Sequence, residues 1–97
     1  MPTFLSLFVW TEQGVHDVVN TGKRAADFRN RIQEAGGAVK NIYWTMGRYD
    51  GVIVFDAPDD ATAAAAMMGG CSKGNIRTET LRAFTEDEIE SVIDKIT

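Results

Sequence analysis

Cysteine, histidine and proline are scarce in this chain of 97 residues, which holds one cysteine, one histidine and two prolines. Cys71 has no second cysteine with which to form an intrachain disulfide, and Cys71 and His16 are too few ligands for a structural metal site. We therefore expect no metal and no other cofactor. A lone thiol is typical of a reducing compartment, and the first residues lack the basic stretch of a secretory signal, so we expect a cytoplasmic protein.

The chain also lacks a surplus of positive charge and a long apolar run. Its formal net charge is −4, and Lys23-Arg24 is its only adjacent pair of basic residues. Nucleic-acid binding needs a concentrated basic face, and a membrane-spanning helix needs about 20 apolar residues. Neither a nucleic acid nor a membrane is therefore an expected partner.

What the chain does contain is the composition of a folded globular domain. Hydrophobic residues make up 44% and charged residues 25% of the sequence, close to the average for globular proteins. We expect one domain over residues 1–97, because this length leaves no room for a second core. A domain of this size buries only about two-thirds of its unfolded surface, so a partner that covers more would add stability.

Periodicity predicts four strands, which are rich in β-branched and aromatic residues. They cover residues 4–10, 39–46, 52–56 and 76–84.

Three helices are predicted from apolar residues that recur three and four apart. The first runs from Asn20 or Thr21 to Gly36-Gly37, the second from Ala57-Pro58 to Gly69-Gly70, and the third follows Thr85. Thr85 and Glu88 have the spacing of a capping box.

The order of these elements predicts an α+β fold of the ferredoxin-like class, β-α-β-β-α-β with an added C-terminal helix. Right-handed crossovers would place both internal helices on one face of a four-stranded antiparallel sheet. The segment around which this fold is organised is the hairpin over residues 41–55, whose tip is Gly47-Arg48-Tyr49-Asp50-Gly51. Glycine and aspartate at this tip are typical turn residues.

Both alternating sets of the first strand are apolar: Leu5, Leu7 and Val9 form one set, and Phe4, Phe8 and Trp10 belong to the other. A sheet face of this composition without cover would be an apolar patch of a size that monomers rarely expose. We therefore predict a homodimer or a higher homo-oligomer, since symmetric copies are the commonest partners. The sequence leaves open which set faces the helices. If the set that contains Phe8 is the open one, the change Phe8→Asp should dissociate the oligomer.

The hairpin also carries a family resemblance. Residues 43–51 resemble the signature of the GYD domain family, which is named after a glycine, a tyrosine and an aspartate, here Gly47, Tyr49 and Asp50 with Arg48 interposed. Residues 74–84 resemble a second typical stretch, and the resemblance extends over essentially the whole chain. It implies a small bacterial protein of ferredoxin-like fold, similar in architecture to the dimeric α/β-barrel proteins. It implies no established set of catalytic residues.

Five polar residues are the predicted ligand-binding set: Tyr43, Tyr49, Asp50, Arg77 and Glu79. A tyrosine, an arginine and a carboxylate that converge in an apolar cavity can orient a small polar ligand or move a proton. Other readings remain open for each of them. Arg77 and Glu79 can be a surface pair, Tyr43 and Tyr49 can be interface anchors, and Asp50 can stabilise its own turn.

Three weaker candidates carry no motif. His16 is a lone histidine in a predicted loop, and Cys71 has no activating base near it in the sequence. Residues 20–24 combine a helix start with Lys23 and Arg24, an arrangement that suits an anion. Their spacing matches neither a P-loop nor a dinucleotide-binding fingerprint.

Three functions fit this sequence. The first is a homo-oligomeric small-molecule-binding module with a ligand space at the open sheet face. The second is an α/β-barrel type enzyme that acts on a small aromatic or apolar substrate with Tyr43, Arg77 and Glu79 as its polar groups. The third is a structural interaction module without a ligand. Fold alone does not decide among them.

Overall fold

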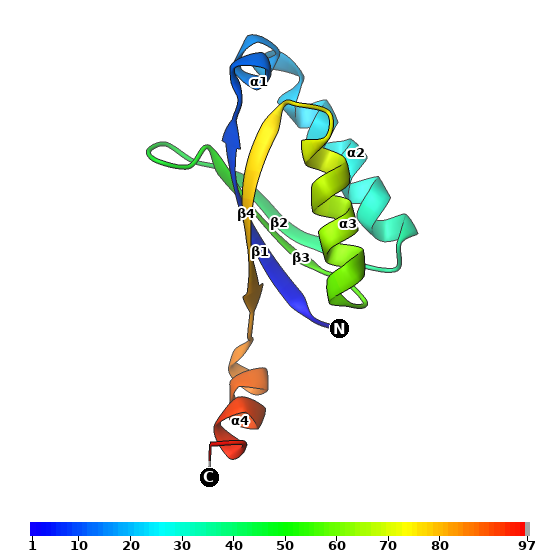
Figure 1. Ribbon diagram of the computed structural model, residues 1–97, viewed down its shortest axis with the longest axis vertical. Helices are drawn as coiled ribbons and strands as arrows, with labels where there is room; N and C mark the ends of the chain where they lie inside the picture. Colours follow the sequence, from blue (N-terminus) through cyan, green and yellow to red (C-terminus); the bar gives the residue numbers. More distant parts are fainter. Residues whose placement is uncertain (97) are drawn as a thin grey trace.

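A computed structural model describes residues 1–96 and gives an α+β fold built on one four-stranded antiparallel sheet (Figure 1). The strand order across the sheet is β2-β3-β1-β4. The strands are β1 (Thr3–Trp10), β2 (Ala38–Trp44), β3 (Gly51–Asp56) and β4 (Ile76–Ala83). The helices are α1 (Glu12–His16), a 3₁₀ turn η1 (Val18–Asn20), α2 (Thr21–Glu34), α3 (Asp60–Cys71) and α4 (Glu86–Asp94).

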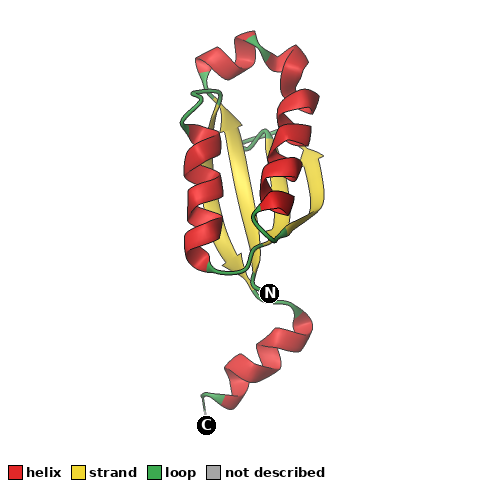
Figure 2. Cartoon of the chain, turned by 90° about the vertical axis from the view of Figure 1, so that its right-hand side faces the viewer, coloured by secondary structure: helices red, strands yellow, loops and turns green. Residues whose placement is uncertain are grey.

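Helices α2 and α3 cover the same face of the sheet, as the predicted element order requires (Figure 2). The connection after β1 was expected to be a loop, but it contains α1 and η1. Thr11 begins α1 by accepting a hydrogen bond from the backbone N–H of Gly14. No helix in residues 1–96 has both the length and the apolar composition needed to cross a membrane.

Helix α3 differs from its prediction at both ends. It begins at Asp60 with Asp59 as its N-cap, so Pro58 precedes the helix. It also continues through Gly69-Gly70 to Cys71, because neither glycine takes a positive φ; the left-handed residue that follows this helix is Gly74, with φ 84°. Glycine permits a helix to end but does not force it to do so.

The core lies between the two helices and the sheet. Phe55 is fully buried and stacks with Phe4 at 5.5 Å between ring centroids, while Phe28 from α2 meets it edge-on at 5.7 Å. From α3 the core receives mainly small side chains such as Ala63 and Ala66, and these let the helix lie close to the strands. Burial of each large apolar side chain contributes about 1.5–3 kcal/mol to folding.

Burial shows which set of β1 residues faces the helices. Phe4, Ser6 and Phe8 are buried on the helix-covered face, whereas Leu5 and Leu7 point to the opposite face. Phe8 is only 5% exposed. The possibility that Phe8 belongs to the open face is therefore wrong, and Phe8→Asp would disrupt the core instead of an interface.

Helix α4 projects away from the body of the molecule, whose extents are 51 × 31 × 18 Å (Figure 1). It starts with the predicted capping box of Thr85 and Glu88, and Arg82 at the end of β4 pairs with Glu88 at 3.1 Å. Its apolar residues Ile89 and Ile93 are 39% and 47% exposed, and Ile96, two residues past its end, is 77% exposed. No strand or other helix within residues 1–96 packs extensively against α4.

Candidate functional site

The sheet face opposite α2 and α3, here called the open face, has an apolar centre and polar edges. Residues of β1 and β3 fill the centre, and the polar residues come from β2 and β4. One row across the sheet runs Tyr43, Val52, Leu7, Glu79, and the next runs Asn41, Val54, Leu5, Leu81. The central side chains of both rows are only half-buried, because no described element covers them.

Arg77 and Glu79 share this face, since they pair with Val9 and Leu7 of β1. Tyr43 lies at the other edge of the sheet, on β2, with β3 and β1 between it and β4. Strand spacing puts its backbone about 14 Å from that of Glu79, and its hydroxyl accepts a hydrogen bond from Asn41 Nδ2 at 3.1 Å. Tyr43, Arg77 and Glu79 therefore do not converge on one point.

Tyr49 is the tyrosine that reaches β4. Its hydroxyl donates to Glu79 Oε2 at 3.0 Å and so joins the hairpin tip to the far edge of the sheet. The guanidinium of Arg48 lies 5.7 Å from the centre of the Tyr49 ring. The pair that the structure brings together on the open face is thus Tyr49 and Glu79.

Asp50 joins the hairpin to β1. Its Oδ2 accepts from the backbone N–H of Trp10 at 2.9 Å, and its own N–H donates to the carbonyl of Phe8 at 2.9 Å. The expectation that this carboxylate bonds within its own turn is therefore corrected. Thr45 closes the turn instead, through its N–H to the Asp50 carbonyl and its hydroxyl to the Tyr49 carbonyl.

The hairpin tip requires glycine at two positions, each for a different steric reason. Gly47 has φ 114°, a conformation that disfavours any residue with a Cβ. At Gly51 a Cβ would lie 2.1 Å from the Phe8 ring, so glycine lets β3 approach that ring. The hairpin signature is therefore explained largely by structure: a turn, a bond to β1, a close approach and one tyrosine on the open face.

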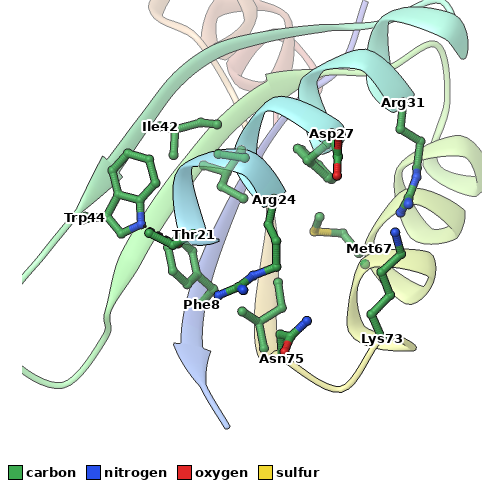
Figure 3. Close-up of a pocket in the computed structure, with 15 residues that line it drawn as sticks. Phe8, Thr21, Arg24, Asp27, Arg31, Ile42, Trp44, Met67, Lys73 and Asn75 are labelled. Carbon is green, nitrogen blue, oxygen red and sulfur yellow. Dashed lines mark hydrogen bonds between the residues drawn. The ribbon is translucent and has the colours of Figure 1, made fainter. Parts of the chain in front are cut away.

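A second place of interest is a cavity of about 90 Å³ on the other side of the sheet, between the sheet, α2 and α3 (Figure 3). The sequence-based hypothesis placed a ligand space at the open face, so this position was not anticipated. Its lining comes from separate strands, helices and loops that span residues 8–76, and such a set leaves no local motif. The one sequence signal was the helix start at residues 20–24, of which Thr21 and Arg24 line the cavity.

Arg24 is the most constrained polar residue of this cavity. Its Nη1 pairs with Asp17 Oδ2 at 2.8 Å and also donates to the Asp17 carbonyl at 3.0 Å. Its Nη2 is buried and has no hydrogen-bond partner within residues 1–96. Nearby, Trp44 Nε1 donates to the hydroxyl of Thr21 at 3.0 Å, which fixes the indole at the cavity edge.

Comparison with known proteins adds the family. The sequence profile of the GYD domain matches residues 4–93. The chain belongs to the GYD domain family. This confirms the resemblance that the hairpin and residues 74–84, which include β4, suggested.

One relative of this GYD chain is the "Glutamine synthetase and cystathionine beta-lyase binding protein" of Thermus thermophilus. It is 36% identical over 85 residues, which cover 87% of this chain and 90% of the relative. The crystal structure of TTHA0845, also from Thermus thermophilus, is similar with a TM-score of 0.55 and 25% identity, over 88% of this chain and 95% of that one.

The remaining titratable candidates of this GYD domain do not form a site. His16 is exposed at the end of α1, and Cys71 Sγ lies 3.3 Å from the hydroxyl of Thr78. The pKa values of Asp59 and Glu88 are lowered chiefly because backbone N–H groups, of Thr62 and Thr85, donate to them. Both carboxyls are helix caps. Within residues 1–96 no three potential ligands are grouped to hold a metal ion.

Proposed function

We propose that this GYD domain is a protein-interaction module that self-associates through its open face and α4. The observation that carries the proposal is that no element within residues 1–96 covers either the apolar sheet centre or the apolar stripe of α4. Exposed Leu81 on β4 and Ile93 on α4 belong to these two surfaces. Monomers rarely expose contiguous apolar patches of this kind.

A second copy of this chain can cover both the open face and the apolar stripe of α4. A nine-residue helix is marginal in water unless its apolar stripe packs against something. In a two-fold pair the same surface serves on both copies, so each α4 can pack against the partner while the open faces meet. Such a pair would be an assembly of the dimeric α/β-barrel type, which the sequence resemblance also implies.

The relative's printed name supports a role in binding other proteins. By this likeness we propose that the assembled GYD domain binds an enzyme, with glutamine synthetase and cystathionine β-lyase as the first candidates. The surface we assign to this partner is the hairpin tip, which extends beyond the sheet (Figure 1). Met46, which directly precedes this tip, is 99% exposed, and methionine adapts readily to varied partner surfaces.

Two alternatives from the sequence rank lower. A small molecule held between open faces would meet the Tyr49–Glu79 pair as its polar contact. An enzyme that uses Tyr43, Arg77 and Glu79 together is disfavoured by their separation across the sheet. The lone thiol of Cys71, which is free, fits the cytoplasm that we propose as the location.

Native mass spectrometry of the purified protein, followed by calorimetric titration with the two enzymes of the same organism, tests the proposal. We expect a dimer or a larger even-numbered oligomer, and measurable heat with at least one enzyme. Met46→Asp should weaken enzyme binding, whereas Met68→Asp, the same change at an exposed methionine of α3, should not. A monomer that binds neither enzyme would contradict both parts.

A further inference from the structure

We propose that the cavity between α2, α3 and the sheet binds a small organic carboxylate with an apolar body. This site lies on the helix-covered face, away from the surfaces assigned to protein partners, and does not depend on that assignment.

The interior of the cavity is apolar. Aromatic rings and aliphatic side chains from the sheet and both helices form it: Phe8, Phe28, Ile42, Ile53, Met67 and Ile76. A cavity needs about 10–15 Å³ of accessible volume to hold one water molecule. The volume of this cavity, about 90 Å³, therefore admits several groups of that size. The cavity is partly open to solvent, so a bound molecule can keep one end at the surface.

The rim of the cavity is positively charged, although the chain carries a net charge of −4. Arg24, Arg31 and Lys73 line it, and among the described residues Asp27 is the only acidic one in the lining. Arg24 is already paired with Asp17, so the free positive charge of the rim belongs to Arg31 and Lys73. The nitrogen ends of Arg31 and Lys73 point toward one another (Figure 3). No carboxylate within residues 1–96 lies within salt-bridge distance of either one.

Two cations that converge without an anion repel one another, and an anion between them removes that repulsion. The Arg31 guanidinium lies against Gly69 of α3, since a Cβ at that position would be 3.2 Å from Arg31 Nη1. A carboxylate suits this position because it accepts charge-assisted hydrogen bonds from both guanidinium and ammonium groups.

Arg24 adds a donor at the other end. Arg24 and Arg31 are seven residues apart on α2, or roughly 10 Å along the helix. The unpartnered Nη2 of Arg24 is buried beside the cavity, and a buried donor without an acceptor is unfavourable. The ligand we infer therefore has its carboxylate between Arg31 and Lys73, and a polar acceptor at the far end of its apolar body would suit Arg24.

The first test uses two simple carboxylates, hexanoate and 4-phenylbutyrate, with 1-hexanol and 4-phenylbutanol as uncharged counterparts. Amide NMR spectra of the isotope-labelled protein report where each one binds. We expect both acids to shift amides of α2 and α3, with dissociation constants about tenfold lower than those of the alcohols. Absence of such shifts at millimolar acid overturns the proposal, as does equal binding of acid and alcohol.

Charge variants locate the carboxylate. Arg31→Gln and Lys73→Gln should each weaken acid binding about tenfold, the loss of one charge-assisted hydrogen bond, and should leave alcohol binding unchanged. Lys23→Gln is the matched control, since Lys23 is an exposed cation of the same helix α2 that does not line the cavity. An equal effect of all three variants would mean that the acids respond only to the overall charge of the protein, and it would overturn the proposal.

A filling variant tests the cavity without removing any charge. Gly70 lines the cavity, and a Cβ there would meet no atom within 4 Å, so Gly70→Leu can enter the open space. Binding of both acids should be lost while the protein stays folded. Ala64→Leu, at an exposed position of α3 outside the cavity, should bind the acids normally. Full binding by Gly70→Leu would contradict the proposed location.

Discussion

The two faces of the sheet have similar apolar content but differ in what covers them. Phe55 and Phe8 are buried beneath α2 and α3, whereas Val54 and Leu7, their immediate neighbours in sequence, point to the face that no other element of residues 1–96 covers. Residues one position apart on a strand must point to opposite faces. Apolar character alone therefore does not identify the core, and the second apolar face is the surface that we propose a partner covers.

The largest expected effect lies on the helix-covered face. Phe55→Ala should lower the free energy of unfolding by about 3–5 kcal/mol, because it removes a fully buried ring and leaves a cavity. Val54→Ala, one residue away on the open face, should cost much less. Urea denaturation of both variants under conditions that hold the oligomeric state fixed compares them. Equal losses of unfolding free energy in the two variants would contradict the distinction between a buried and an open face.

Helix α4 should matter for assembly and little for the fold of the domain. Ile93→Asp places a charge in its apolar stripe and should raise the dissociation constant of the oligomer by at least about tenfold. Ser91→Asp adds the same charge at another exposed position of α4 and is the control. Analytical ultracentrifugation measures both. An unchanged dissociation constant for the Ile93 variant would mean that α4 does not belong to the interface.

The polar edge of the open face should have a smaller role. Tyr49→Phe removes the hydroxyl that donates to Glu79 and should destabilise the protein by about 0.5–1.5 kcal/mol, nearer the lower value because the bond is exposed. Tyr43→Phe removes an exposed hydroxyl at the opposite edge and should have less effect. Thermal unfolding distinguishes them, and a larger loss for the Tyr43 variant would reverse this ranking.

The smallest expected effect is a loss of helix stability in acid. The lowered pKa values of Asp59 and Glu88 mean that their capping bonds stabilise the fold above the ordinary values of 3.8 and 4.5. This contribution is lost as the pH falls through the lower folded-state pKa values. Asp59→Asn keeps an acceptor without the titration, so its acid unfolding by circular dichroism should depend less steeply on pH. Glu34→Gln, at an exposed residue of α2, should retain the wild-type slope.

Much of the fold follows from local rules in the sequence. The capping box at Thr85, the order of the strands and helices, and the hairpin with its turn at Gly47 all depend on residues close together in the chain. Their physical causes, namely capping bonds, periodicity and turn conformation, act over a few residues. These features are therefore predictable from the sequence.

What the sequence did not reveal depends on contacts between distant segments. The packing of α2 and α3 on the sheet decides which side chains of β1 are buried. Because both alternating sets of β1 are apolar, its sequence does not distinguish them. Asp50 bonds to Trp10, forty residues earlier, in place of its own turn. Arg31 and Lys73 meet at the cavity only because α2 and α3 cover the same face (Figures 2 and 3). The spacing of residues within a single helix or strand cannot predict that these two side chains line the same cavity.

The most direct test of the account introduces the same charge at two adjacent positions of β1. Leu7→Asp and Phe8→Asp are each studied by native mass spectrometry and circular dichroism. We predict that the Leu7 variant is a folded monomer, since Leu7 lies at the centre of the open face, and that the Phe8 variant is unfolded, since Phe8 lies in the core. A Leu7 variant with the mass of the wild-type oligomer, or a wild-type protein that is itself a monomer, would contradict the account.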